Sequence, residues 1–304
     1  MNSFKQQLEQ YAQWTQECLE QPFAAAGGRP GDRSDALQPA GRRKTAAGSA
    51  GSGNFARVLC GDAKRALTGA CALEMVHAYS LIHDDLPCMD DDEMRRGKPS
   101  CHIAFGEAVA LLAGDGLLTK AFEVLAASEE LDAQQRADSV LLLAKAAGHQ
   151  GMIGGQRMDL ENETFCADIE RVRRTDRLKT GELICAAAQM GCIAAKATAE
   201  QMQAAQEYAH SIGLAFQITD DILDCVGDAE QLGKPTGSDE ENHKTTYVSV
   251  YGVQGAAEQA QQQVLLAKQA LPGLGKGKKR GGSRLFVPVG RLYPDSEELT
   301  GIRD

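Results

Sequence analysis

Two clusters of aspartates carry the residue types and the spacing that could do chemistry. The first runs from Asp84 to Glu93 and holds six acids, two before Pro87 and four after it. The second runs from Asp220 to Asp224 inside a strongly apolar stretch. Because residues four apart lie on one face of a helix, Asp220 and Asp224 are predicted to point the same way. Carboxylate oxygens suit Mg²⁺, which completes its shell with water and substrate phosphates.

Each cluster also has an ordinary alternative. The first could be a solvated acidic loop, and the second a helix N-terminus or a solvated acidic edge. However, Arg95 and Arg96 follow the first cluster at once, which an acidic loop does not require. Acids placed among core-type residues repel one another and lose hydration, so they are costly without a compensating cation. Two such clusters in one chain therefore favour a site for metal and phosphate.

Composition limits the class of protein. The chain has 304 residues, of which 43% are hydrophobic and 24% charged, as in ordinary globular proteins. Abundant alanine and few β-branched residues predict helix. A net charge of −10 argues against a nucleic-acid-binding surface, which would be basic. No stretch approaches the roughly 20 apolar residues of a membrane span. The nine cysteines never form a CxxC pair, so we expect reduced thiols and a cytoplasmic protein.

The elements that must position the two clusters are predicted to be helices. Helical periodicity is expected over residues 1–22, 63–83, 104–128, 134–153, 168–192 and 199–226. They are separated by short polar or Gly/Pro breaks, which predicts a single all-α domain over residues 1–272. Residues 24–54 are anomalous within it, because they contain almost no large apolar residue. Residues 273–304 form a basic, glycine-rich segment that we expect to be a poorly ordered, irregular tail.

Several motifs resemble those of bacterial farnesyl diphosphate synthases, which are short-chain trans-polyprenyl diphosphate synthases. SLIHDDLPCMDDD at 80–92, followed by RRGKP at 95–99, is similar to their first aspartate-rich motif. FQITDDILD at 216–224 resembles the second. Further matches are GQRMDL at 155–160, KTG at 179–181, GKPTG at 233–237 and HKTTY at 243–247. The resemblance covers about residues 55–272 and implies an isoprenoid-synthase helical bundle around a central active-site cavity.

The resemblance also implies a reaction. A Mg²⁺-dependent prenyltransferase would condense isopentenyl diphosphate with dimethylallyl or geranyl diphosphate to farnesyl diphosphate, as a homodimer. Three substrate-bridged Mg²⁺ ions would lie between Asp84, Asp90 and Asp220, supported by Asp85 and Asp224, and draw charge from the leaving diphosphate. The catalytic residues would be Asp84, Asp90, Lys179 and Asp220. The substrate-binding residues would be Lys44, His77, Arg95, Arg96, Lys179, Thr180, Gln217, Lys234 and Lys244.

Ordinary alternatives remain for several of these residues. His77 could be a core histidine, and only its place seven residues before Asp84 favours a ligand role. Lys179 and Lys244 could be surface charges, as most lysines are. Thr180 could cap a turn. In this family the residues just upstream of the first motif limit product length. Tyr79 stands there, so its bulk favours a C15 product, with geranyl or geranylgeranyl diphosphate synthesis as the alternative.

One segment departs from the family. Where relatives carry a Gly-Gly-Lys-Arg-x-Arg stretch that binds isopentenyl diphosphate, this chain has AGRRKTAAG at 40–48. One choice of codons for residues 44–52, entered one base later, encodes Lys-Arg-Leu-Arg-Val-Leu-Leu-Val. We therefore hypothesise a frameshift over residues 24–54. A catalytically impaired homologue that still binds Mg²⁺ and the allylic diphosphate is a second hypothesis. A terpene cyclase is a third, but it would not need a second diphosphate site.

Overall fold

The computed structural model describes residues 59, 62–95, 97–226 and 244–275. Lys44, Arg96, Lys234, the predicted helix at 1–22 and the anomalous segment 24–54 lie outside these residues. The predicted tail lies outside them from residue 276 onward. The described chain is built of helices with one small pair of strands, so the all-α fold class is confirmed. It divides into two compact units.

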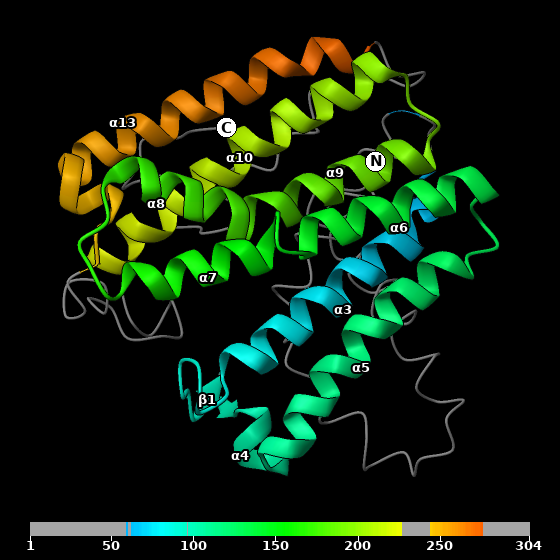
Figure 1. The fold of residues 1–304 in the computed structure, drawn as a ribbon. Helices are drawn as coiled ribbons and strands as arrows, with labels where there is room; N and C mark the ends of the chain where they lie inside the picture. Colours follow the sequence, from blue (N-terminus) through cyan, green and yellow to red (C-terminus); the bar gives the residue numbers. More distant parts are fainter. Residues whose placement is uncertain (1–58, 60–61, 96, 227–243, 276–304) are drawn as a thin grey trace. The chain divides into compact units, whose positions relative to one another are not determined.

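The first unit holds the described residues up to Leu143 together with Met190–Lys196. Its elements are η1 (Lys64–Ala66), α3 (Leu67–Asp84), β1 (Met94–Arg95), β2 (Lys98–Pro99), α4 (Cys101–Phe105), α5 (Glu107–Ala126) and most of α6 (Ala133–Ala147). Helices α3 and α5 lie side by side (Figure 1). Small residues allow this close approach, because a Cβ on Gly114 of α5 would meet the ring of His83 at 2.0 Å.

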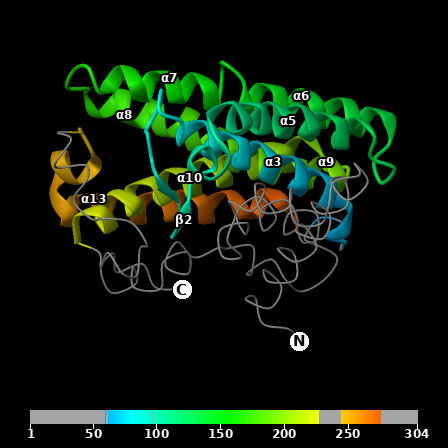
Figure 2. The same cartoon turned by 90° about the horizontal axis from the view of Figure 1, so that it is seen from below.

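The second unit holds Ala144–Gln189 and the described residues from Ala197 onward. Its elements are the end of α6, α7 (Met152–Asn162), α8 (Ile169–Asp176), η2 (Arg177–Gly181), α9 (Glu182–Ala194, ending in the first unit), α10 (Ala199–Val226), α13 (Tyr247–Ala270) and η3 (Leu271–Leu274). Helices α10 and α13 run along each other in both views (Figures 1 and 2). Ile218, Ile222, Tyr247 and Val264 form the buried core between them.

Several predicted boundaries were wrong. The helix expected at 134–153 ends at Ala147, and α7 begins separately at Met152. The chain turns between them at Gly148 and Gly151, where an added Cβ would strike backbone carbonyl oxygens. The helix expected at 168–192 is interrupted by η2, a π-helical turn. Helix α13 was not predicted at all, although its second half is rich in the strong helix formers alanine and glutamine.

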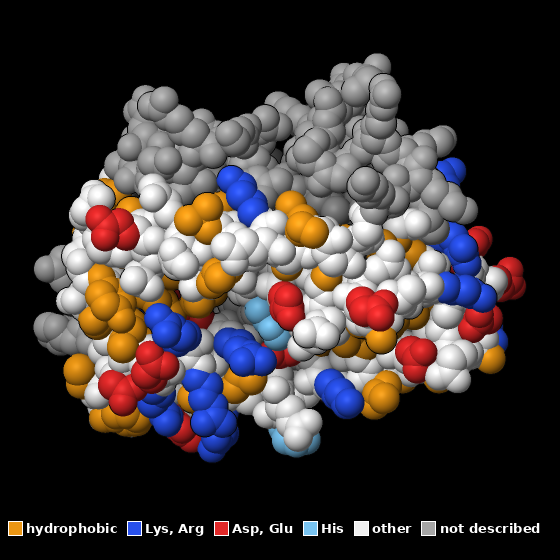
Figure 3. Space-filling view, turned by 90° about the horizontal axis from the view of Figure 1, so that it is seen from above, with side chains coloured by type: hydrophobic (Ala, Val, Ile, Leu, Met, Phe, Trp, Pro, Cys, Tyr) orange, Lys and Arg blue, Asp and Glu red, His pale blue; other side chains and the backbone are white. Residues whose placement is uncertain are grey.

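The described helices and surface can be compared with those of membrane-spanning and nucleic-acid-binding proteins, the two classes that the sequence disfavours. No helix among the described residues is long and apolar enough to cross a membrane. On the face that Figure 3 shows, Lys and Arg side chains lie among Asp and Glu side chains. The described part of this face therefore lacks the continuous basic field that a nucleic-acid-binding surface would have.

Candidate active site

The first aspartate cluster occupies the end of α3 and the loop that follows. Asp84 is the last residue of α3, and the amide of Asp90 donates to its carbonyl oxygen over 2.9 Å. The amide of Met89 donates to the carbonyl of Leu86 over 2.8 Å. Asp91 has a left-handed backbone with φ of 52°, which aspartate tolerates better than most residues. The loop thus closes on itself and holds the backbones of Asp84 and Asp90 together.

Asp85 is buried and pairs with Arg95 on β1. The Nε atom of Arg95 donates to Oδ1 and Oδ2 of Asp85 over 2.7 and 2.9 Å, and its Nη2 atom contacts the same carboxylate. Nη2 also lies 3.2 Å from Asp92 Oδ2. Burial lowers the pKa of the guanidinium, but the bonds and charge of Asp85 outweigh this and raise it. Arg95 is therefore a fixed cation held at the rim of the first cluster.

Tyr79 lies about one helical turn before the first cluster and is 5% exposed. Its ring meets that of His83 edge to face, with centroids 5.6 Å apart. His83 Nε2 lies 3.0 Å from the carbonyl oxygen of Leu111 on α5. Burial, with the charge of Asp84, raises the pKa of the Tyr79 hydroxyl to about 12. Tyr79 is thus neutral and packs against His83, which in turn contacts α5, and the half-buried His77 stands two residues earlier on α3.

In the second unit, α7 approaches η2 closely at Lys179. A Cβ on Gly155 would lie 2.2 Å from the backbone nitrogen of Lys179, so only glycine fits here. Asp159 stands one turn further along the same face of α7. Its Oδ2 atom lies 2.6 Å from Nζ of Lys179, and both side chains are about one-third exposed (29% and 33%). Helix α7 therefore gives Lys179 both a backbone contact and a charge partner.

Asp176, at the end of α8, shares this neighbourhood. Burial raises the pKa of its carboxyl to about 7, and the charge of Asp159 acts in the same direction. A hydrogen bond with Gln217 and the charge of Lys179 oppose the rise, while Asp220 adds to it. The second unit thus gathers three carboxylates, one lysine and one amide from α7, α8, η2 and α10. Such crowding of negative charge favours a cation or a proton.

The second aspartate cluster is carried by the last turns of α10. Asp220 and Asp221 are half-buried, and Asp224 is 3% exposed. Asp221 accepts a hydrogen bond of 2.8 Å from the amide of Tyr247, the first residue of α13. It thereby satisfies a backbone donor that a helix N-terminus leaves open. Asp221 consequently ties α13 to α10.

Thr180 and Lys244 complete the predicted residues that the structure describes. Thr180 lies in η2, next to Lys179, and is half-buried. Lys244 is exposed, and its Nζ atom lies 3.9 Å from Glu163 Oε1, at the limit of an ion pair. This contact places Lys244 beside the end of α7. Within the described ranges, no group of three or more His, Cys, Asp or Glu side chains is arranged to enclose a metal by itself.

Of the residues that the motifs predicted, Lys179, Gln217 and Asp220 each lie near Asp176, and Asp159 pairs with Lys179. Their roles in binding stay predictions. Asp159 belongs to the GQRMDL motif, but the motif alone gave it no role. Asp176 was missed, because it stands among arginines in a segment that is typical of a solvated helix face. Only the packing of α7 against α8 and η2 reveals that its carboxyl faces other acids.

Known proteins resemble this chain in sequence and in fold. The family model for polyprenyl synthetase matches residues 49–271. Farnesyl diphosphate synthase from Geobacillus stearothermophilus is 47% identical over 207 residues, covering 66% of this chain and 69% of that protein. Geranylgeranyl diphosphate synthase from Cyanophora paradoxa is 41% identical over 233 residues, covering 73% and 78%. The crystal structure of an FPP/GFPP synthase from Zymomonas mobilis matches with a TM-score of 0.77 and 33% identity, covering 95% of this chain and 98% of that one.

A helical fold with two aspartate-rich clusters and a lysine among carboxylates is typical of a prenyltransferase. The chain belongs to the polyprenyl synthetase family. The matched span begins at residue 49 and ends at residue 271, close to the extent of about 55–272 that the motifs predicted.

Proposed function

We propose that this chain is a farnesyl diphosphate synthase, which condenses isopentenyl diphosphate with dimethylallyl or geranyl diphosphate. The observation that carries the proposal is the group of side chains around Lys179 and Asp176, namely Asp159, Gln217 and Asp220, which we call the Lys179 neighbourhood. A lysine that pairs with Asp159 and that lies, like Gln217 and Asp220, near Asp176 suits a diphosphate whose negative charge grows as its C–O bond breaks. The similarity to bacterial farnesyl diphosphate synthases supports the same activity.

Two cations would divide the binding of the allylic diphosphate in this proposal. Lys179 offers a compact charge from η2, and Asp159 keeps it from swinging into solvent. Arg95 offers a planar guanidinium whose orientation is set by buried Asp85. Asp85 then acts through Arg95 in addition to supporting the metal ligands. The apolar residues of α3 would keep water from the allylic cation.

The donor set fits Mg²⁺. Asp84, Asp90 and Asp220 would hold the ions, with Asp85 and Asp224 in support, and bound Mg²⁺ would supply Lewis-acid stabilisation of the leaving diphosphate. Burial is the main cause that raises the pKa of Asp176 to about 7, and the negative charges of Asp159 and Asp220 add to the rise, so a cation would be favoured near these carboxyls. Three substrate-bridged ions remain our expectation.

Tyr79 supports a C15 product. A neutral, buried aromatic ring, wedged against His83 upstream of the first cluster, would leave no room there for a longer chain. Identity points the same way, because four bacterial farnesyl diphosphate synthases are 45–47% identical to this chain. Four geranylgeranyl diphosphate synthases, one of them putative by name, are 40–43% identical.

The isopentenyl half of the reaction supports a second candidate, an impaired homologue that binds Mg²⁺ and the allylic diphosphate only. The family match begins at residue 49, so residues 40–48 precede it. Family members carry isopentenyl-binding basic residues in that part of the chain, where this one has Lys44 after AGRR. His77, Arg96 and Lys44 are the residues that would have to bind isopentenyl diphosphate, and Lys234 and Lys244 would assist at the allylic site with Thr180.

Two further properties belong to the proposal. Exposed apolar side chains on α4 and α5, namely Ile103, Val109 and Leu112, would suit an interface between two copies in a homodimer. The seven cysteines among the described residues form no disulfide with one another, which suits the reducing cytoplasm.

The test incubates the purified chain with isopentenyl diphosphate, either allylic diphosphate, and Mg²⁺ or a chelator. The proposal predicts Mg²⁺-dependent formation of farnesyl diphosphate from both allylic substrates. Titration calorimetry of each substrate then separates the two candidates. Binding of geranyl diphosphate without binding of isopentenyl diphosphate would support the impaired homologue, and turnover with a C20 product would replace the farnesyl assignment.

A further inference from the structure

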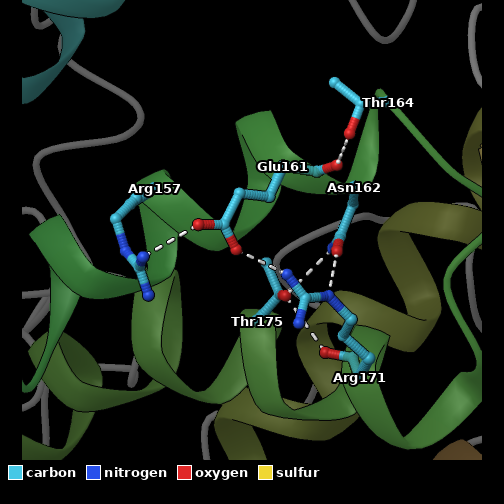
Figure 4. Close-up of polar contacts among 6 residues, drawn as sticks. All are labelled: Arg157, Glu161, Asn162, Thr164, Arg171 and Thr175. Carbon is cyan, nitrogen blue, oxygen red and sulfur yellow. Dashed lines mark hydrogen bonds and ion pairs between the residues drawn. The ribbon is translucent and has the colours of Figure 1, made fainter.

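A ring of polar contacts ties the end of α7 to α8, outside the aspartate clusters and the Lys179 neighbourhood (Figure 4). Arg171 donates from Nε to Asn162 Oδ1 over 2.6 Å and from Nη2 to Glu161 Oε2 over 2.7 Å. Asn162 Nδ2 donates to Thr175 Oγ1 over 3.1 Å. That hydroxyl donates in turn to the carbonyl oxygen of Arg171 over 3.0 Å, which closes the ring. We call these four residues, Glu161, Asn162, Arg171 and Thr175, the α7–α8 clamp.

The clamp is built more firmly than a chance surface contact. The guanidinium of Arg171 also lies over the ring of Phe165, 4.9 Å from its centroid, in the loop between the two helices. Thr175 is 4% exposed, and its hydroxyl both donates and accepts. The backbone amide of Arg171 is held by Asp168, which caps α8 over 2.8 Å. Arg171 thus joins α7, the connecting loop and α8 at one point.

The clamp lies beside the Lys179 neighbourhood on both helices. On α7, Asn162 is three residues after Asp159, which places the two on adjacent turns of one face. On α8, Thr175 immediately precedes Asp176, and η2 begins at the next residue. Asp159 and Asp176 repel each other across the same gap. The clamp therefore links α7 to α8 beside the point where Asp159 pairs with Lys179.

We propose that Arg171 is a positioning residue for the allylic diphosphate site: through the α7–α8 clamp it holds α7 where Asp159 can fix Lys179. This inference rests on the proposed function, because the role of Lys179 belongs to that proposal. Arg171 touches no reacting atom in this scheme, since its donors serve Asn162 and Glu161. Without the clamp, α7 loses its link to α8, and Asp159 no longer holds Lys179 in one fixed position.

The main test compares Arg171→Met with Arg157→Met in the full-length chain. Arg157 is 72% exposed and contacts the other oxygen of Glu161 over 2.8 Å from its own helix, so its loss removes a similar charge but no link between helices. Thr175→Val provides a second variant of nearly unchanged shape that opens the ring. Arg171→Lys keeps the charge toward Glu161 while losing the planar fork.

The measurements are kcat and KM for geranyl and isopentenyl diphosphates, calorimetric binding of inorganic diphosphate with Mg²⁺, and circular dichroism. We expect Arg171→Met and Thr175→Val to stay helical. Their kcat/KM for geranyl diphosphate should fall by about 10- to 100-fold, the scale for a reacting group displaced by about 1 Å. Their affinity for inorganic diphosphate should fall as well, while their KM for isopentenyl diphosphate stays near the wild-type value. The Arg157→Met enzyme should stay near wild type in all of these measurements. Arg171→Lys should recover part of the loss.

Three results would overturn the inference. One is wild-type kinetics and diphosphate binding in Arg171→Met. Another is an equal loss in Arg157→Met. The third is a loss of activity that follows the folded fraction with both KM values unchanged, which is what a merely structural role gives. If the wild-type chain binds diphosphate without condensing substrates, the proposed function fails while the binding comparison still decides this inference. If it binds no diphosphate, both fail.

Discussion

Replacing Asp176 by asparagine tests the electrostatics of the second unit. Burial and the charge of Asp159 raise the pKa of this carboxyl from 3.8 to about 7. A raised carboxyl pKa means that the folded state binds the proton more tightly than the unfolded state. Its contribution to stability is therefore complete below the unfolded pKa near 4 and is lost as pH rises through the folded pKa near 7. The asparagine side chain has no such proton to lose, so the variant lacks this dependence.

The expected magnitude follows from the same values. From about pH 5 to about pH 8, the wild-type chain should lose up to about 3 kcal/mol relative to the variant, at about 1.4 kcal/mol for each pH unit up to the folded pKa. Because Asp176 is only half-buried, screening by solvent reduces our expectation to about 1–2 kcal/mol. Asparagine can still share a hydrogen bond with Gln217, so packing changes little.

The assay is urea unfolding of both chains, followed by circular dichroism across this pH range, with chelator present so that no cation neutralises the carboxylates. The difference in free energy of unfolding, variant minus wild type, should grow with pH. Asp138→Asn, on the exposed face of α6, is the matched control, because it makes the same substitution at a solvated position. A difference for Asp176→Asn that stays constant from about pH 5 to about pH 8 would refute the reasoning.

Three further changes have defined outcomes. Gly155→Ala places a methyl group 2.2 Å from the Lys179 backbone, so urea unfolding should show a loss of about 1–3 kcal/mol; a neutral result would mean that α7 shifts freely. Asp85→Asn leaves Arg95 without its buried carboxylate partner, so the free energy of unfolding should fall by about 2–4 kcal/mol. The KM for geranyl diphosphate should also rise, and an unchanged KM would mean that Arg95 does not bind this substrate. Tyr79→Ala should lengthen the product beyond C15 by chromatography and cost about 3 kcal/mol, whereas an unchanged product would remove Tyr79 from length control.

The fold class and much of the chemistry could be predicted from the sequence, for physical reasons. Acids such as Asp220 and Asp224 in an apolar helix are costly without a cation, so their type and spacing are informative by themselves. A helix was predicted over residues 63–83 because its apolar pattern is dense, and α3 covers Leu67–Asp84. Helix α13 was missed because Gly252, with a φ of 69°, interrupts its first turns and weakens the pattern.

The partners of the charged residues could not be predicted in the same way. No local sequence pattern shows that Asp85 pairs with Arg95 or that Asp221 accepts from the first amide of α13. Both contacts depend on how the chain folds back after each aspartate cluster. Asp176 and the α7–α8 clamp were missed for the same reason. The roles of Lys44, Arg96 and Lys234, and the frameshift over residues 24–54, concern residues outside the described structure and stay predictions.

Condensation itself is the most direct test of the account. Purified chain would be mixed with geranyl diphosphate, labelled isopentenyl diphosphate and Mg²⁺, and the label followed into product by chromatography and mass spectrometry. The expected product is farnesyl diphosphate, with one diphosphate released for each molecule formed. A folded chain that binds both substrates and Mg²⁺ yet transfers no label would contradict it.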